Sequence, residues 1–400
     1  MMDSNVGHSQ KVSGVDILDN PGSRIQHPGS SIQGLRVVIA GGGTGGHVYP
    51  GLAIAEALVA LRPQTEVLFV GGAGVERQVV PRAGWPFHRV AARAWPRRLS
   101  WTLPWAMMLT AAGTAQAFAL LQRWRPQVVV ATGGYAAAPV GAAAAVLKIP
   151  LVVQEQNLYP GAANRILARW AQIISVPHER VAARFGRATV VTGVPVRTGA
   201  LGGDRARGWQ RFGLGDRQLT LLVLGGSQGA RNLNAHVIGM AERLNGERDV
   251  QILHQTGQEH EEWVRARLGS LGGSLRYVAV PYIEEMGDAY ACADLVVCRA
   301  GAGTLAEVTA NGLPAIAVPY PYAAGGHQDA NARLLESAGA AMVVPDRELS
   351  GLRLAQAVGA LHADPARLHA MAVASRQLGR PQAARHVAEL VIAAAEKGSS

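Results

Sequence analysis

The chain has 400 residues, of which 48% are apolar and 16% charged, which is enough for two domains with separate cores. This composition excludes a short peptide hormone and an acidic disordered tail. With 48 glycines and only 5% aromatic residues, it favours an α/β class over a large all-β sandwich. Two cysteines, Cys292 and Cys298, are too few for a disulfide framework or a cysteine-rich zinc site. No signal peptide is evident, so we expect a cytosolic protein.

The formal net charge of +10 is concentrated in the first half of the chain. Residues 35–197 contain 17 Lys and Arg against 5 Asp and Glu, whereas residues 198–400 contain 19 against 20. No acidic residue occurs between Glu76 and Glu155. We therefore expect an anionic partner on this half, and the sign alone fits both nucleic acid and an anionic membrane surface.

The tryptophans favour the membrane. Five of the eight fall in the basic stretch, namely Trp85, Trp95, Trp101, Trp105 and Trp124. Because Trp with Arg is typical of a membrane interface, residues 85–125 predict docking to an anionic membrane surface and no nucleic acid. The alternative is a half-buried helix whose tryptophans belong to the core. Residues 99–122 are uncharged and long enough to span a bilayer, but Pro104, Gly113 and several Thr make them too weakly apolar for that.

The order of apolar runs predicts two domains of similar kind. Residues 1–34 are polar and lack periodicity, so we expect a disordered leader. Thereafter, short apolar runs alternate with longer helix-like stretches, which is typical of parallel sheets with crossover helices. The expected strands of the first sheet are 36–40, 66–70, 128–131, 151–154, 173–176 and 189–192. Those of the second are 219–224, 251–254, 277–280, 294–298, 315–318 and 341–344. The segment 193–208 is the expected linker, and a helix near 382–397 closes the chain.

Each expected sheet opens with the same local pattern. VVIAGGGTGGH (37–47) and LVLGGSQGA (222–230) each read as a strand, a glycine loop and the start of a helix. Such a loop lets backbone N–H groups and the helix N-terminus face an anion at the carboxyl ends of the strands. The implied architecture is a pair of nucleotide-binding folds facing each other across a cleft.

Three other enzyme classes share parts of this pattern. A dehydrogenase requires an acidic residue at the end of the second strand, where this chain has FVGG (69–72). A P-loop requires a lysine after the glycine loop, and none of the three lysines stands there. The run Gly225–Gly229 also fits the G-x-S-x-G turn of hydrolases, with His327 downstream. That class leaves the first glycine loop unexplained, and the preferred interpretation makes Ser227 a hydrogen-bond donor to phosphate.

Several polar residues near the expected cleft are candidates for the chemistry. His47 directly follows the first loop, where a neutral imidazole can act as a general base, although a single histidine is more often structural. Glu307 lies in the first turns of a helix, where it could accept both ribose hydroxyls or simply stabilise the helix dipole. Gln328 and Asn331 could bind sugar hydroxyls or cap their helix.

Seven motifs, taken together and in order, resemble the MurG family of peptidoglycan glycosyltransferases. The motifs are GGTGGHVYP (42–50), GGY (133–135) with Pro139, QEQN (154–157), VPVR (194–197), GGSQGAR (225–231), CRAGA (298–302), and Gln328 with Asn331-Ala332. This family moves N-acetylglucosamine from its UDP donor onto lipid I to make lipid II. Two positions depart from the family pattern: Val194, where Asn is usual, and Gly325-Gly326, where an acidic residue is common.

The resemblance implies the GT-B fold, an α/β architecture of two Rossmann-like domains with parallel sheets. Residues 35–197 with the helix at about 382–397 would face lipid I and the membrane, and residues 198–381 would hold UDP-N-acetylglucosamine. It implies a peripheral protein on the cytoplasmic face of the inner membrane. The sequence shows no cluster of carboxylates for a catalytic metal, so we expect no metal or other cofactor. The implied donor-site residues are Thr44, Gly45, Gly46, Asn157, Arg197, Ser227, Ile283, Ala302, Gly303, Thr304, Leu305, Glu307 and Gln328.

The implied reaction inverts the anomeric carbon in one displacement. We expect His47 to accept the proton of the acceptor 4-hydroxyl. Arg197, Ser227 and helix N-terminal N–H groups are expected to stabilise the departing diphosphate. Two other functions stay open: a regulator that binds the nucleotide sugar without turnover, and a GT-B enzyme that uses a different lipid acceptor.

Overall fold

The computed structural model describes residues 34–94, 101–216, 218–226, 228–247, 249–269 and 274–398. Nearly all of the expected leader lies outside these ranges, as do Trp95, Arg97, Arg98 and the site candidate Ser227.

The first sheet of the described chain has seven strands in the order β3-β2-β1-β4-β5-β6-β7. Every neighbouring pair is parallel. The strands are β1 (Arg36–Gly41), β2 (Glu66–Gly71), β3 (Phe87–Arg89), β4 (Val128–Gly133), β5 (Leu151–Gln154), β6 (Ile173–Val176) and β7 (Val190–Val191). Central strands such as β4 are buried on both faces, which is why they appear as continuous apolar runs in the sequence. The edge strand β3 was not predicted, because its three residues include one apolar side chain and show no periodicity.

The second sheet has six strands in the order β10-β9-β8-β11-β12-β13, again with all neighbouring pairs parallel among the described residues. The strands are β8 (Leu219–Leu224), β9 (Val250–Gln255), β10 (Arg276–Val280), β11 (Leu295–Arg299), β12 (Ala315–Val318) and β13 (Ala341–Val343). Each of the twelve expected strands overlaps an observed one. The predicted fold class, two Rossmann-like domains with parallel sheets, is confirmed.

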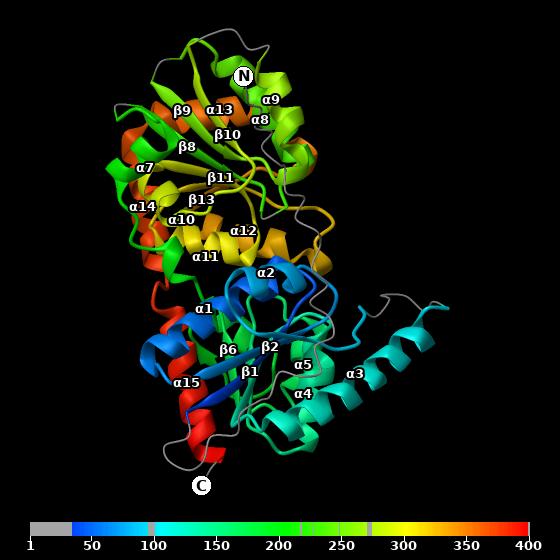
Figure 1. The fold of residues 1–400 in the computed structure, drawn as a ribbon. Coiled ribbons are helices and arrows are strands. Elements are labelled where there is room, and N and C mark those ends of the chain that lie inside the picture. The colour runs from blue at the N-terminus through cyan, green and yellow to red at the C-terminus, as the bar shows by residue number, and fades with distance from the viewer. Residues whose placement is uncertain are drawn as a thin grey trace, which may run out of the picture. The chain divides into compact units, whose positions relative to one another are not determined.

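Helices cover both faces of each sheet (Figure 1). Those around the first sheet are α1 (Gly45–Leu61), α2 (Glu76–Arg82), α3 (Leu103–Trp124), α4 (Ala137–Val146), α5 (Ala162–Leu167), α6 (Glu179–Ala182) and α15 (Ala383–Gly398). Those around the second are α7 (Arg205–Phe212), α8 (Arg231–Leu244), α9 (Glu261–Leu268), α10 (Met286–Cys292), α11 (Ala302–Ala310), α12 (His327–Ser337), α13 (Gly351–His362) and α14 (Pro365–Leu378). Short 3₁₀ turns are η1 (Thr198–Ala200), η2 (Gln258–His260), η3 (Ala324–Gly326) and η4 (Asp346–Glu348).

The last helix returns to the first sheet. In α15, Val387 and Val391 are fully buried in the same apolar cluster as Ile54 and Leu58 of α1. Figure 1 shows α15, in red, running beside the blue α1. The chain therefore crosses between its two sheets twice, once before α7 and once between α14 and α15.

The order of strands reverses next to β1 in the first sheet and next to β8 in the second. At such a switch point, the loops after the two central strands separate to opposite faces and leave a crevice for ligands. The loops concerned follow β1 and β4 in the first sheet, and β8 and β11 in the second. Both glycine loops of the sequence analysis thus lie where a doubly wound sheet binds its ligand.

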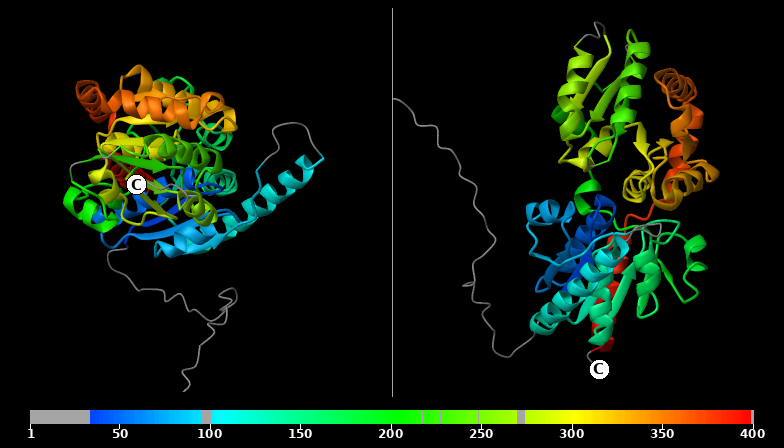
Figure 2. Two further views of the ribbon diagram at one scale, coloured as in Figure 1. Left: turned by 90° about the horizontal axis from the view of Figure 1, so that it is seen from above. Right: turned by 90° about the vertical axis from the view of Figure 1, so that its right-hand side faces the viewer.

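One helix extends well beyond the first sheet. The teal α3 projects away from the other helices in Figure 1 and in the left view of Figure 2. Ala117 and Leu121, in its C-terminal half, are buried, whereas Trp105, Met107 and Met108, near its N-terminus, are about half exposed. Among the described helices, α3 included, none combines the length and apolar character needed to cross a bilayer.

Candidate active site

A cavity of about 660 Å³ lies between the two sheets, a volume within the range of small-molecule sites. Residues of α1 form one wall, the connecting segment adds Arg197, and loops and helices that follow the strands of the second sheet form the rest. From the first domain come Gly45, Gly46, Tyr49 and Pro50. From the second come, among others, Gly225, Gly226, Asn232, Gln255, Tyr282, Tyr290, Ala302, Gly303, Thr304, Glu307 and Gln328.

Three helices begin at this cavity. The N-terminal residues of α1, α8 and α11 all line it, and none of the three has an acidic residue in its first turn. Helix N-termini carry unpaired N–H groups and a partial positive charge, so their convergence favours an anion. Gly226, in the loop before α8, has a φ of +90°, a conformation that favours glycine. Without a side chain, its backbone stays open to a ligand on this side, because a Cβ there would point into open space. The cavity is therefore suited to a phosphate-bearing ligand.

Arg197 lines the cavity from the segment that connects the two domains. Its guanidinium lies 4.8 Å from the ring centroid of Tyr49 in α1, and the hydroxyls of Tyr49 and Tyr282 are 3.4 Å apart. The Nε atom of Arg197 is buried and has no hydrogen-bond partner among the described residues. A buried cation with an unused donor at the edge of this cavity is suited to bind an anionic ligand.

Glu307 supplies the acidic group of the cavity. Oε2 of its carboxylate accepts a 2.8 Å hydrogen bond from the hydroxyl of Tyr290. Burial raises the pKa of Glu307, while the charge of Arg197 and the hydrogen bond from Tyr290 act in the opposite direction. One carboxylate oxygen is thus held in place by the protein, and the group is oriented as an acceptor for ligand hydroxyls.

His47 lies at the start of α1, next to the end of β4. Its Nδ1 atom is 3.1 Å from the backbone oxygen of Thr132 and 3.3 Å from Oε1 of Gln156. Burial lowers the pKa of His47, although the charge of Glu155 raises it in part. The imidazole is therefore neutral near pH 7 and able to accept a proton.

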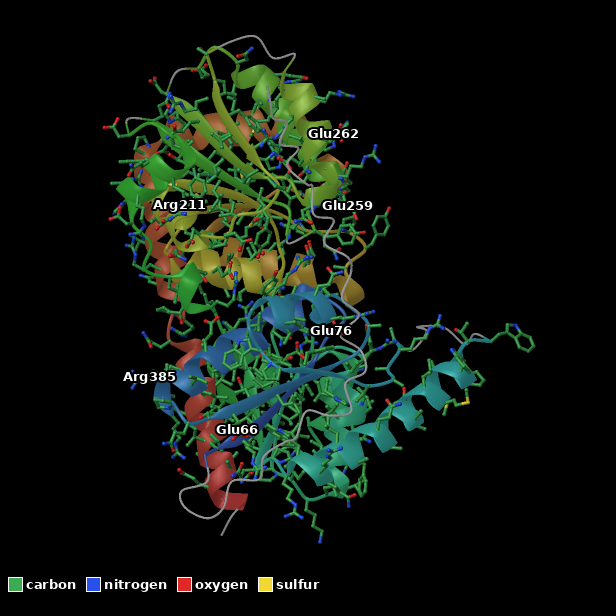
Figure 3. All side chains as sticks on the ribbon, viewed as in Figure 1. Glu66, Glu76, Arg211, Glu259, Glu262 and Arg385 are labelled. Atoms are coloured by element: carbon green, nitrogen blue, oxygen red, sulfur yellow. The ribbon has the colours of Figure 1, made fainter. Side chains whose placement is uncertain are left out.

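A buried carboxylate holds the first glycine loop. Oxygens of Glu76 accept hydrogen bonds from the backbone N–H groups of Gly43 at 2.8 Å, Gly72 at 2.9 Å and Gly74 at 3.1 Å. Figure 3 labels Glu76 on the side of the first domain that faces the second. The N–H group of Gly43 is consequently already bound to a carboxylate of the protein. Of this loop, only Gly45 and Gly46 line the cavity.

The structure brings most, but not all, of the expected site residues to the cavity. Those that line it are Gly45, Gly46, Arg197, Ala302, Gly303, Thr304, Glu307 and Gln328. Thr44 is exposed just before α1, and Asn157 donates to Oε1 of Glu155. Leu305 faces a smaller neighbouring cavity, and Ile283 is buried with its N–H donated to Gln255. Gln328 already accepts a hydrogen bond from the backbone N–H of Tyr320.

Several residues of the cavity had no assigned role in the sequence analysis. Tyr49 stands two residues after His47 inside the motif GGTGGHVYP (42–50), so its position in the sequence could have identified it as a site residue. No such signal marks Tyr290 or Gln255, because α10 and β9 carry no local sequence pattern that separates a site residue from a core residue. Gln255 donates to the oxygen of Gly226 and accepts from Ile283, which ties the second glycine loop to the loop after β10.

The two departures from the family pattern have definite structural settings. Val194 is 8% exposed and lines the smaller cavity between the domains. Gly325 and Gly326 have φ values of +61° and +67°. An acidic side chain there would be strained in this left-handed conformation, so the loop before α12 is built for glycine.

Comparisons with known proteins agree over both domains. Residues 37–176 match the N-terminal domain of glycosyltransferase family 28, and residues 220–387 match its C-terminal domain. The UDP-N-acetylglucosamine--N-acetylmuramyl-(pentapeptide) pyrophosphoryl-undecaprenol N-acetylglucosamine transferase of Desulforudis audaxviator is 42% identical over 372 residues, covering 91% of this chain and 100% of that relative. The crystal structure of Acinetobacter baumannii MurG is 30% identical with a TM-score of 0.70, covering 90% of this chain and 99% of that one. This chain belongs to the MurG family.

Further relatives agree with this assignment. The enzyme of the same name from Moorella thermoacetica is 43% identical over 371 residues, which are 91% of this chain and 100% of that relative. MurG family membership confirms the resemblance on which the GT-B prediction rested. It also excludes the dehydrogenase and the G-x-S-x-G hydrolase as descriptions of this chain.

Proposed function

We propose that this chain transfers N-acetylglucosamine from UDP-N-acetylglucosamine to lipid I, giving lipid II for peptidoglycan and cell wall synthesis. The observation that carries this proposal is the 42% identity that extends over the full length of a curated transferase. Lipid I is N-acetylmuramyl-pentapeptide joined through a pyrophosphate to undecaprenol, and the attacking group is its 4-hydroxyl. The chain is thus a hexosyltransferase with one nucleotide-sugar donor and one lipid acceptor.

The cavity supports a role in holding the donor. We assign the diphosphate to the helix N-termini of α8 and α11 and to Arg197, and the ribose to Glu307. The proposed donor-site residues are Thr44, Gly45, Gly46, Asn157, Arg197, Ser227, Ile283, Ala302, Gly303, Thr304, Leu305, Glu307 and Gln328. Among these, those that line the cavity are expected to contribute most to donor affinity.

The reaction we propose is a single displacement at the anomeric carbon. Nε2 of His47 takes the proton of the acceptor hydroxyl as its oxygen attacks from the face opposite UDP. The bond from the anomeric carbon to the diphosphate oxygen breaks, and UDP leaves with both electrons. Arg197 and the helix N-termini stabilise the charge that develops on the leaving diphosphate. His47 and Arg197 are therefore the proposed catalytic residues.

The domain roles follow from the same assignment. We propose that residues 35–197 together with α15 form the acceptor domain, and residues 198–381 the donor domain. In support, α15 shares its apolar cluster with α1, and α7 is tied to α10 by an ion pair between Arg207 and Asp288.

We further propose that the acceptor domain docks on the cytoplasmic face of the inner membrane as a peripheral protein. Support comes from the start of α3, where Trp101 is 100% exposed and Trp105, Met107 and Met108 are about half exposed. Exposed Arg89 and Arg93 precede this helix. The proposed membrane patch is narrower than the residues 85–125 predicted from the sequence, because Trp85 packs on Phe69 and Trp124 packs against the core.

The decisive experiment incubates the protein with labelled UDP-N-acetylglucosamine and a short-chain lipid I analogue. We expect label to move to the acceptor as a β1-4 linked disaccharide, identified by mass spectrometry and glycosidase digestion. Donor binding without turnover would indicate a nucleotide-sugar-binding regulator instead. Transfer only to a diacylglycerol-type lipid would indicate a different GT-B enzyme.

A further inference from the structure

We propose that Gln156 is a positioning residue that holds the His47 imidazole with its proton on Nδ1, which leaves the Nε2 lone pair for the acceptor hydroxyl. The inference rests on the proposed role of His47 as the base and adds the group that orients it. Gln156 comes from the loop after β5, 109 residues beyond His47.

The contacts of the ring determine where its proton lies. Among the described residues, both hydrogen bonds of the His47 ring are made by Nδ1, one with the Thr132 oxygen at 3.1 Å and one with Gln156 Oε1 at 3.3 Å. A backbone carbonyl and an amide oxygen can only accept, so Nδ1 carries the hydrogen. Nε2 is then unprotonated, which is the state that a general base requires.

The orientation of the Gln156 amide is determined by its other end. Nε2 of Gln156 donates to the Thr132 oxygen at 2.7 Å and to Gln154 Oε1 at 2.6 Å. An inverted amide would place an oxygen against these two oxygens, which cannot donate. The amide oxygen is therefore the atom that faces His47, and Gln156 is only 2% exposed.

The backbone under Gln156 is also held. Oε1 of Glu155 accepts from the N–H groups of Gln156 at 3.0 Å and Asn157 at 2.9 Å, while Oε2 accepts from the N–H of Gly161 at 3.0 Å. This buried carboxylate is a hydrogen-bond centre for the loop, much as Glu76 is for the first glycine loop. Gln156 therefore reaches His47 from a loop whose backbone is anchored on both sides.

A glutamine at position 156 is compatible with His47 acting as a base. The charged groups that face His47 are Glu155, which raises its pKa, and His327, which lowers it, while burial is the largest influence and lowers it. A carboxylate in place of the Gln156 amide would also orient the ring, but it would raise the pKa of His47 and favour the protonated ring at neutral pH. Glutamine orients the imidazole and leaves it neutral.

The test combines nuclear magnetic resonance of ¹⁵N-histidine-labelled protein with the pH profile of turnover. His47 is assigned from the signals lost in His47→Gln, and we expect a neutral ring protonated at Nδ1. His254 is an internal reference of the opposite kind, because its Nε2 lies 3.1 Å from Asn234 Oδ1 and its Nδ1 lies 2.6 Å from the Tyr277 hydroxyl. The Asn234 amide donates to the Thr256 oxygen, so Oδ1 is the acceptor and His254 carries its hydrogen on Nε2.

Two variants then test Gln156 itself. In Gln156→Glu, we expect the His47 titration and the acid limb of the kcat profile to move together to higher pH, by about one unit. In Gln156→Met, we expect both to move to lower pH, and kcat to fall about 10-fold with the KM for UDP-N-acetylglucosamine within twofold. This loss is smaller than the ~10⁴-fold seen when the orienting carboxylate of a serine-protease triad is replaced, because the Thr132 carbonyl remains.

A matched control separates positioning from packing. Gln251 is also a fully buried glutamine, bound to Gly215 and Thr220 in the second domain. Gln251→Met should lower the melting temperature and leave the His47 signals and pH profile unchanged. The proposal is overturned if His47 is protonated at Nε2 in the wild-type protein, or if neither Gln156 variant moves its titration. Normal turnover of His47→Gln would refute His47 as the base, whereas the resonance data would still decide the role of Gln156 on the ring.

Discussion

The hydroxyl of Tyr290 donates a 2.8 Å hydrogen bond to Oε2 of Glu307, and both residues line the same cavity. Tyr290 is 1% exposed, so this donor is held firmly by the core of the second domain. Because the contact occupies one carboxylate oxygen from the side of α10, we expect it to orient Glu307 for the proposed contact with the ribose. We therefore expect affinity for the donor to depend on a residue of α10 as well as on α11.

We expect Tyr290→Phe to weaken UDP binding about 10-fold, the usual cost of losing one hydrogen bond to a charged group. Loss of this bond also removes an interaction that lowers the pKa of Glu307. Since that pKa is already raised by burial, protonation of Glu307, and with it the loss of UDP affinity, should begin at higher pH in the variant. Isothermal titration calorimetry across pH 5 to 8 measures both effects.

The matched control for that experiment is Tyr277→Phe. Tyr277 also donates from a largely buried hydroxyl in the second domain, but its partner is His254, away from the cavity. Its UDP affinity should equal that of the wild type. Equal affinities for wild type, Tyr290→Phe and Glu307→Ala would contradict the ribose assignment.

Replacement of His47 by Gln should lower kcat by about 10²- to 10⁴-fold, the range for a positioned general base. Donor affinity should change little, because His47 does not line the cavity proposed to hold the donor. The wild-type rate should fall on the acid side as His47 becomes protonated, at a pH below the usual range for histidine because burial lowers its pKa. Steady-state kinetics between pH 4.5 and 8 test this, with the exposed His386→Gln of α15 as the control. Near-normal kcat in His47→Gln would remove the base assignment.

A second histidine should control acid stability. Burial lowers the pKa of His254 from its usual 6.5 to about 3. Between these values the unfolded chain binds a proton that the folded chain does not, so stability falls as the pH drops below 6.5. At pH 5 this one site should cost about 2 kcal/mol relative to pH 7.

Urea unfolding at pH 5 and pH 7 measures that cost. His254→Gln lacks the titrating group, so its stability should differ less between the two pH values, although it will be less stable at pH 7 because Tyr277 and Asn234 lose their partner. A wild-type difference that His254→Gln retains in full would show that other groups cause the acid sensitivity.

The membrane proposal predicts that Trp101→Ser with Trp105→Ser reduces binding to anionic vesicles about 10-fold, since each exposed indole contributes apolar area to the interface. Vesicle sedimentation measures this, and binding of the wild type should weaken in high salt because basic residues take part. Trp170→Ser is the control, because Trp170 is 53% exposed but lies outside α3. Equal binding to neutral and anionic vesicles would eliminate the electrostatic contribution.

The sequence by itself determined the fold class, nearly all the strands and the position of both glycine loops. These features are local: a strand buried on both faces is a continuous apolar run, and a loop that meets an anion requires glycine. The same local pattern made His47 a candidate base, because it directly follows a loop of this kind. The sequence did not predict β3, because its three residues are too few to show a pattern.

Only the tertiary structure decided which side chains support the site. The amide of Gln156 meets His47 across 109 residues, and the hydroxyl of Tyr290 meets Glu307 from a neighbouring helix. It also packed Trp85 and Trp124 against the core while leaving Trp101 exposed, although all three stand in one basic stretch. Such contacts depend on how helices and loops pack around the sheets, and periodicity or spacing along the chain carries no record of that packing.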